Sequence, residues 1–135
     1  MNAVVLDASA GAEIVARTTL GRSLLALVPH DRVWWVPDHF HVETAGALRR
    51  MLLKGLIDQP RADDALSRLL SMPVVVSRSS VLISEAWEYR NNLIVHDAVY
   101  VVLAKHLDAV LLTGDQKLAG APNLPVQVIH ISGVI

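Results

Sequence analysis

Short runs made only of apolar residues alternate along this chain with longer segments of helical spacing. A strand that is apolar on both sides must be covered on both faces, and strands separated by helices pair in parallel. Five strands are expected, at residues 3–6, 33–36, 74–76, 109–112 and 126–131, and all but the last are wholly apolar. The sequence therefore predicts a three-layer α/β/α fold, in which a mainly parallel sheet of these five strands lies between two layers of helices.

Helical spacing and capping residues predict seven helices between and after these strands. Asp38 is expected to cap a long helix that runs to Lys54, with Gly55 as its C-terminal stop. The helix that begins at His96 is apolar over residues 98–103 and should be buried on most of its surface. The other helices are expected at residues 9–17, 20–28, 58–71, 79–90 and around 117.

Composition narrows the classes of function. The 135 residues have the size of one ordinary domain, so residues 1–135 are interpreted as a single domain. No cysteine is present, which excludes disulfides, thiolate zinc sites and a cysteine nucleophile. Lysine and arginine (12) nearly balance aspartate and glutamate (13), so charge alone indicates neither a nucleic-acid binder nor a membrane-surface binder.

The apolar runs are too short for a membrane span. Residues 98–104 form one of the longest, whereas a spanning helix needs roughly 20 residues. The first residues contain no basic segment and include an acid, Asp7, unlike a secretory signal or a transit peptide. We therefore expect no membrane association and a location in the cytoplasm.

Two acids follow closely on predicted strands. Asp7 comes directly after the strand at residues 3–6, and Asp115 follows the strand at residues 109–112. In parallel sheets, ligands bind beyond the carboxyl ends of the strands. Asp7 and Asp115 are therefore expected on the same edge of the sheet.

Four carboxylates stand beside strongly apolar segments, namely Asp7, Glu43, Asp97 and Asp115. An isolated buried carboxylate costs several kcal/mol, and a cluster adds like-charge repulsion that only cations or protonation relieve. Oxygen ligands favour Mg²⁺ or Mn²⁺, because zinc would prefer cysteine or several histidines. The pattern indicates metal-assisted hydrolysis of phosphodiester bonds.

Each acid also has a purely structural interpretation. Asp97 suits the first turn of a helix, where the helix dipole favours a carboxylate. Asp115 suits a turn after glycine. Asp7 could cap the following helix, although Ser9 is at least as good a cap. Glu43 is the hardest to explain in this way, because it shares a largely apolar helix face, and coincidence explains all four together less well than any one alone.

Four segments, taken in order, resemble the PIN-domain ribonucleases, and in particular the VapC-type toxins of bacterial toxin–antitoxin modules. They are Val5–Ser9, Val42–Arg50, His96–Tyr100 and Leu112–Leu118. The resemblance extends over nearly the whole chain. Two positions depart from the pattern of many relatives, since Ile94 and His96 stand where those proteins carry threonine and tyrosine. Both departures concern substrate preference more than activity.

The resemblance implies a compact α/β/α fold in which Asp7, Glu43, Asp97 and Asp115 line a Mg²⁺ or Mn²⁺ site that cuts RNA. One metal, held chiefly by Asp7 and Asp97 with Asp115, would activate a water for in-line attack and leave 3′-hydroxyl and 5′-phosphate ends. Glu43 either ligates an ion or accepts a proton. Lys117 stands where a further acid could follow Asp115, so a second metal stays open.

Two hydroxyl residues accompany these acids. Thr113 matches the hydroxyl position two residues before the last acid of the family pattern, where it would orient a carboxylate or a water. Ser9 would act likewise, or would simply cap the following helix.

Basic and aromatic residues suggest how RNA is held. Without the four candidate acids, 9 acids remain against 12 basic residues, a balance of +3. Arg49, Arg50 and Lys54 follow Glu43 on the same predicted helix and are expected either to contact phosphates or to form a solvated helix end. The tryptophans and two histidines have either a binding or a packing role, namely Trp34, Trp35, Trp87, His39 and His96.

The apolar fraction, 53%, exceeds what a domain of this size readily buries. We therefore expect a homodimer or a bound inhibitor segment. The resemblance implies a cognate VapB-type antitoxin, for which the helices around Leu20–Val28 and Ala62–Leu70 are candidate contacts.

Two other functions stay open from the sequence. One is a catalytically silent PIN-like module that binds RNA or a partner. The other is a phosphatase of the haloacid-dehalogenase type, whose opening motif has a second acid where Ser9 stands and which gives Glu43 no task.

Overall fold

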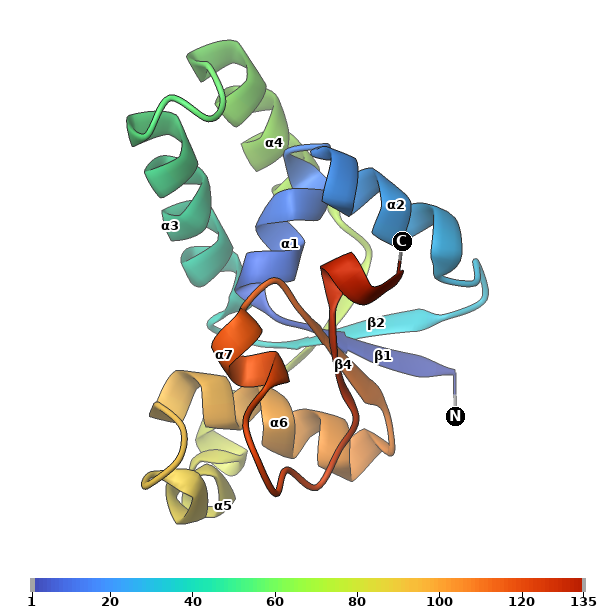
Figure 1. The fold of residues 1–135 in the computed structure, drawn as a ribbon, viewed down its shortest axis with the longest axis vertical. Coiled ribbons are helices and arrows are strands. Elements are labelled where there is room, and N and C mark those ends of the chain that lie inside the picture. The colour runs from blue at the N-terminus through green and yellow to red at the C-terminus, as the bar shows by residue number, and fades with distance from the viewer. Residues whose placement is uncertain (1, 135) are drawn as a thin grey trace.

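The computed structural model describes residues 2–134 and has a central sheet of five strands, all parallel, in the order β3-β2-β1-β4-β5 (Figure 1). The predicted fold class is confirmed. The strands are β1 (Ala3–Leu6), β2 (Val33–Pro37), β3 (Val74–Ser77), β4 (Val110–Thr113) and β5 (Val128–His130). β5 is shorter than the run of residues 126–131 predicted it to be.

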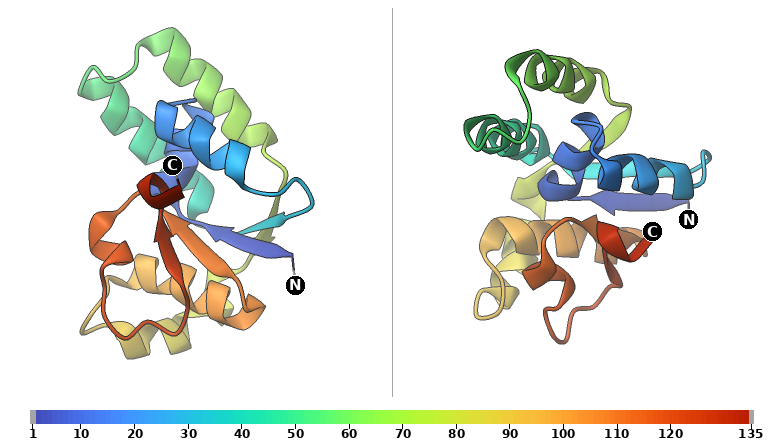
Figure 2. Two further views of the ribbon diagram at one scale, coloured as in Figure 1. Left: turned by 45° about the vertical axis from the view of Figure 1, so that its right-hand side comes forward. Right: turned by 45° about the horizontal axis from the view of Figure 1, so that its top comes forward.

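Helices cover both faces of the sheet (Figure 2). One layer contains α1 (Ala8–Val15), α2 (Thr19–Leu27), α3 (Phe40–Leu53) and α4 (Gln59–Ser71). The opposite layer contains α5 (Ile83–Ala86) and α6 (Val95–Leu107), and α7 (Gln116–Ala119) follows β4. Short 3₁₀ helices complete the chain, η1 (Ser79–Val81), η2 (Trp87–Tyr89) and η3 (Ile131–Val134). Within residues 2–134, no helix is both long and apolar enough to cross a membrane.

The central strand pair fixes the edge where the candidate acids lie. β1 pairs with β4 so that Leu6 lies opposite Leu112, and the Asp7 amide donates to the Leu112 carbonyl at 3.1 Å. The next residues along, Asp7 and Thr113, are therefore neighbours at the carboxyl ends of two adjacent strands. Both are buried.

The burial of α6 follows its sequence. Every residue of 98–104 is buried, as the apolar run predicts. Since α6 packs against β1, β2 and β4, it forms the main cover of one sheet face. Its first turn reaches the edge of the sheet where Asp7 lies.

Two predicted helix starts are wrong. Asp38 does not cap α3: its amide donates to the Ser77 carbonyl at 2.8 Å, which continues the pairing of β2 with β3 by one residue, and His39 becomes the N-cap without a side-chain hydrogen bond. Hydrogen bonding to Ser79 instead lowers the pKa of Asp38. Ser9 is not a cap either, because it lies inside α1, which Asp7 caps.

The single helix predicted at residues 79–90 is replaced by η1, α5 and η2. Of this segment only Leu82 and Ala86 are buried. So narrow an apolar face offers little packing to hold a regular helix of three turns. The stop of α3 is confirmed, since Gly55 follows the helix with a φ of 72°, a left-handed conformation that glycine adopts readily.

Candidate active site

Asp7 is the most enclosed of the four candidate acids. It is 4% exposed, and its Oδ1 accepts hydrogen bonds from the Ala10 amide at 3.0 Å and from the Ser9 hydroxyl at 2.7 Å. The Thr113 hydroxyl donates to Oδ2. Burial raises the pKa of Asp7, because the cost of desolvating the charge exceeds the benefit of the hydrogen bonds from Thr113, Ala10 and Ser9.

Two hydroxyl groups join the ends of β1 and β4. Ser9 Oγ accepts a hydrogen bond from the Gly114 amide at 2.8 Å, and Thr113 Oγ1 accepts one from the Asp115 amide at 3.0 Å. Both hydroxyl protons are committed to Asp7. Two of these four hydrogen bonds orient the Asp7 carboxylate, and the other two hold the turn that carries Asp115. Ser9 and Thr113 therefore tie the two acids together.

Asp115 is the N-cap of α7. Its Oδ1 accepts a hydrogen bond from the Lys117 amide at 2.9 Å. One of its two carboxylate oxygens therefore has the local structural role that the sequence allowed for this acid. Within residues 2–134, its other carboxylate oxygen accepts no hydrogen bond.

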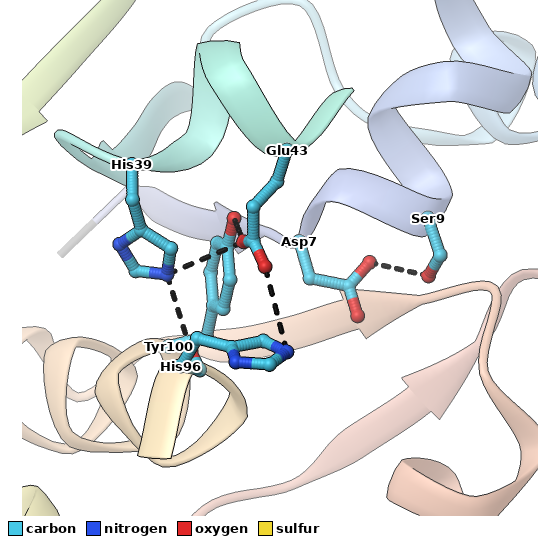
Figure 3. Close-up of polar contacts among 6 residues, drawn as sticks. All are labelled: Asp7, Ser9, His39, Glu43, His96 and Tyr100. Carbon is cyan, nitrogen blue, oxygen red and sulfur yellow. Dashed lines mark hydrogen bonds and ion pairs between the residues drawn. The ribbon is translucent and has the colours of Figure 1, made fainter. Parts of the chain in front are cut away.

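Glu43 lies in the first turn of α3 and is surrounded by rings (Figure 3). Its Oε1 accepts a hydrogen bond from the Tyr100 hydroxyl at 2.8 Å and lies 3.3 Å from His39 Nε2, while Oε2 lies 3.6 Å from His96 Nε2. His39 Nε2 also faces the His96 carbonyl at 3.2 Å. Because both of its neighbours are acceptors, this nitrogen carries the proton.

Asp97 receives the electrostatic effect of the other three acids. It lies in the first turn of α6 and is half-buried. Burial is the largest reason that its pKa is raised to about 6; His96 lowers it, and Asp7, Asp115 and Glu43 each raise it further. Each of the other three acids therefore lies near enough to Asp97 to repel its charge, and Asp115 acts on Asp7 in the same way.

These carboxylates suit a divalent cation. Mutual repulsion among oxygen donors is what a bound cation would relieve, and carboxylate oxygens suit Mg²⁺ or Mn²⁺. Among residues 2–134, no three acidic or histidine side chains are grouped closely enough to form a ready cage for a metal. That arrangement fits Mg²⁺, which keeps several waters and takes only one or two carboxylates directly.

The predicted RNA contacts occupy less central positions. Arg49, Arg50 and Lys54 are exposed on the C-terminal half of α3, and the rise of a helix places Lys54 about 16 Å along the axis from Glu43. Trp34 and Trp35 are half-buried in β2 and pack against the core. Trp87, by contrast, is 54% exposed.

Two residues of this site were not singled out from the sequence. Tyr100 follows Asp97 by three positions on α6, which places the two side chains on one helix face, so a signal was present. His130 Nε2 donates to the Gly114 carbonyl at 3.0 Å, since the other ring nitrogen accepts from the Ser132 amide. No local pattern reveals His130, because its place beside Thr113 depends on the pairing of β4 with β5.

A family model described as PIN domain matches residues 4–124, which is most of the chain. The chain belongs to the PIN-domain family. This PIN domain is 34% identical over 132 residues to ribonuclease VapC1 of Mycobacterium tuberculosis, and the match covers 95% of the chain and 97% of VapC1. Its sequence relatives therefore place it among the VapC proteins.

Two solved structures resemble this PIN domain. The crystal structure of Mycobacterium tuberculosis VapC20, described as a sarcin-ricin loop cleaving toxin, matches with a TM-score of 0.64 at 21% identity and covers 92% of this chain and 98% of its own. VapBC2 from Rickettsia felis, bound to a DNA fragment from its promoter, matches with a TM-score of 0.63 at 12% identity, covering 95% and 98%. At these identities the likeness shows the fold.

Proposed function

We propose that this protein is a Mg²⁺- or Mn²⁺-dependent endoribonuclease, the toxin of a VapBC-type toxin–antitoxin module. The observation that supports the proposal most is the approach of Asp7, Glu43 and Asp115 to Asp97 at one edge of the sheet, near enough that each raises the pKa of Asp97 beyond the effect of its burial. A cluster of this kind costs free energy of folding, so its presence indicates a functional role. The ribonuclease name of the relative VapC1 supports RNA as the substrate.

In the proposed mechanism Asp7, Asp97 and Asp115 would hold the cation, one or two of them directly and the rest through its bound waters. When bound, it supplies a water that is acidic near neutral pH and a charge that stabilises the leaving oxygen. Ser9 and Thr113 keep the Asp7 carboxylate in one orientation through their hydrogen bonds. A water oxygen would attack phosphorus in line and form the new P–O bond as the bond to the 3′ oxygen breaks. The water would lose a proton to Glu43 or to solvent and the 3′ oxygen would gain one, which leaves 3′-hydroxyl and 5′-phosphate ends.

Glu43 has two possible tasks in this scheme, to ligate the cation or to accept the proton of the attacking water. Tyr100 and His39 both approach Oε1, so Oε2 is the atom with fewer partners. We infer that Glu43 acts through Oε2.

We also propose inhibition by a cognate VapB-type antitoxin. The structure of Rickettsia felis VapBC2 supports a partner of this kind. A groove of about 730 Å³ lies between α1, α2 and the end of α4, with an apolar lining and three arginines at its sides. Leu25 and Val28 line it from α2 and its C-cap, but the middle of the predicted Ala62–Leu70 contact is not part of it, because Ala62, Ala65 and Leu69 are buried in the core.

We also propose that the protein acts in the cytoplasm, where RNA is translated. We propose further that it forms a homodimer there. Large apolar side chains remain exposed, including Val42 at 77%, Leu70 at 71% and Leu53 at 67%. Contact with another chain would cover surface of this kind.

Incubation of labelled RNA with the purified protein and with its Asp7→Asn variant tests the function. Mg²⁺, Mn²⁺ and EDTA are compared, and the product ends are identified. We expect metal-dependent 5′-phosphate products from the wild type only. Equal cleavage by both proteins would point to a contaminating nuclease, and no cleavage of any RNA together with no tight Mn²⁺ binding would favour a silent binding module. Asp63→Asn, an exposed acid on α4, is the matched control.

A further inference from the structure

A tryptophan lies on the surface just before the helix that carries Asp97. Trp87 in η2 is 54% exposed, whereas Trp34 and Trp35 are half-buried against the core. A large aromatic ring left in water is costly and commonly marks a binding surface. Nothing in the nuclease mechanism above uses this residue.

Arg90 holds a fixed position over the ring. Its guanidinium lies 5.4 Å from the centre of the Trp87 ring, and its NH1 donates to the Trp87 carbonyl at 3.0 Å. A cation on an aromatic face is an attractive pair, and the second contact limits its motion. The pair thus presents a flat ring and a positive charge together, without reorganising.

The pair borders a hollow formed by the segment that precedes α6 and by its first residue. The hollow has a volume of about 540 Å³ and is lined by Trp87, Arg90, Asn92, Leu93, Ile94 and Val95. Val95 begins α6, and Asp97 lies in the same first turn. The segment that forms the hollow leads directly to the amino end of α6 (Figure 1).

The chemistry of this hollow matches an unpaired nucleobase. An aromatic face stacks on any base, the exposed Asn92 amide offers both a donor and an acceptor to a base edge, and a guanidinium attracts the adjoining phosphate. The acid cluster itself repels a polyanion, so a cation on the segment that leads to α6 has an evident use in attracting RNA.

We propose that Trp87 and Arg90 form a stacking site for an unpaired base of the RNA strand whose phosphate reaches the acid cluster. The site would make the protein select single-stranded or looped RNA at this position. This inference rests on the proposed nuclease function, and it names a feature of the substrate that the acids alone do not determine.

Binding measured without cleavage tests the site. A labelled RNA of about 12 nucleotides, single-stranded or as a duplex of the same sequence, is titrated in EDTA and its fluorescence anisotropy is recorded. We expect Trp87→Ala to weaken single-strand binding about 10-fold, and Trp87→Phe, which keeps an aromatic face, to weaken it only about 2-fold. Duplex binding should not change.

Val81→Ala is the matched control, because Val81 is 65% exposed in the same segment but has no ring. It should bind both RNAs as the wild type does. Molar mass by light scattering is measured for every variant. Single-strand affinity that is unchanged in Trp87→Ala, or absent in the wild type, would overturn the site. A mass that falls from dimer to monomer in Trp87→Ala with unchanged RNA affinity would overturn it in favour of a contact between two copies.

Cleavage of the same RNA by the wild type in Mn²⁺ is scored separately. RNA binding that depends on Trp87, without any cleavage, would support the stacking site and contradict the proposed nuclease function. Cleavage of RNA whose binding does not depend on Trp87 would support the nuclease function and contradict the stacking site.

Discussion

The two sides of the acid cluster are held in different ways. On one side, Asp7 is buried and receives hydrogen bonds from two hydroxyls and an amide at the ends of β1 and β4. On the other, Glu43 is 28% exposed and contacts the rings of His39, His96 and Tyr100. The first side is fixed by pairing within the sheet, and the second depends on how α3 and α6 meet across its edge. We therefore expect the Asp7 side to tolerate change least.

Asp7→Asn should show the largest effect. The variant keeps the shape of the side chain but removes the charge that the cation requires, so we expect RNA cleavage to fall by more than about 100-fold. The rate of cleavage in Mn²⁺ is the measurement. Asp63→Asn should retain the wild-type rate, and a similar loss in that control would mean that the assay reports general damage.

Thr113→Val tests whether the hydroxyl positions Asp7. The isosteric change removes the donor to Asp7 Oδ2 and the acceptor of the Asp115 amide, so cleavage should fall about 10- to 100-fold, and the free energy of unfolding by ~1–3 kcal/mol. Denaturant unfolding and Mn²⁺ titration are the measurements. Thr113→Ser keeps the hydroxyl and should recover most of both. Wild-type Mn²⁺ affinity in Thr113→Val would show that Asp7 needs no such support.

Tyr100→Phe is the equivalent test on the Glu43 side. It removes only the hydroxyl that donates to Oε1, and we expect cleavage and Mn²⁺ affinity to fall about 10-fold, less than in Thr113→Val. A double-mutant cycle with Glu43→Gln separates positioning from packing. In the Glu43→Gln background the loss of the Tyr100 hydroxyl should have little further effect; additive losses would mean that Tyr100 acts independently of Glu43.

The smallest expected effect is on stability and follows from Asp97. Its pKa in the folded protein is raised to about 6 from an ordinary value of 3.8, so between these pH values the folded protein binds the proton and the unfolded chain does not. Stability of the metal-free protein therefore falls as pH rises from about 4 to 6. Allowing for its partial exposure, the cost above pH 6 is ~1–2 kcal/mol.

Asp97→Asn removes that cost. We expect the variant to melt at a higher temperature than the wild type at pH 7.5 without metal, and at a similar temperature near pH 4. Calorimetry at the two pH values is the measurement. An equal difference in melting temperature between variant and wild type at both pH values would show that Asp97 does not titrate in this range. Added Mn²⁺ should stabilise the wild type and not the variant.

Local patterns in the sequence account for the strands and for the placing of the acids. β1 and β4 are apolar on both sides, so their carboxyl ends had to meet at one edge, and Asp7 and Asp115 follow those ends. What could not be read from the sequence depends on side chains from distant segments. Asp38 does not cap α3 because its amide instead extends the pairing of β2 with β3. Tyr100 donates to Glu43 because α3 and α6, which lie on opposite faces of the sheet, meet across its edge (Figure 2).

The hydrogen bond between Thr113 and Asp7 joins residues 106 positions apart. During synthesis the chain emerges from its amino end, and β1 must wait for β4 before the central strand pair exists. Asp7 is made 106 residues before Thr113, so its carboxylate gains this orienting hydroxyl only after β4 has been made. Under the proposed function, the growing chain cannot cut RNA until the ribosome has made β4.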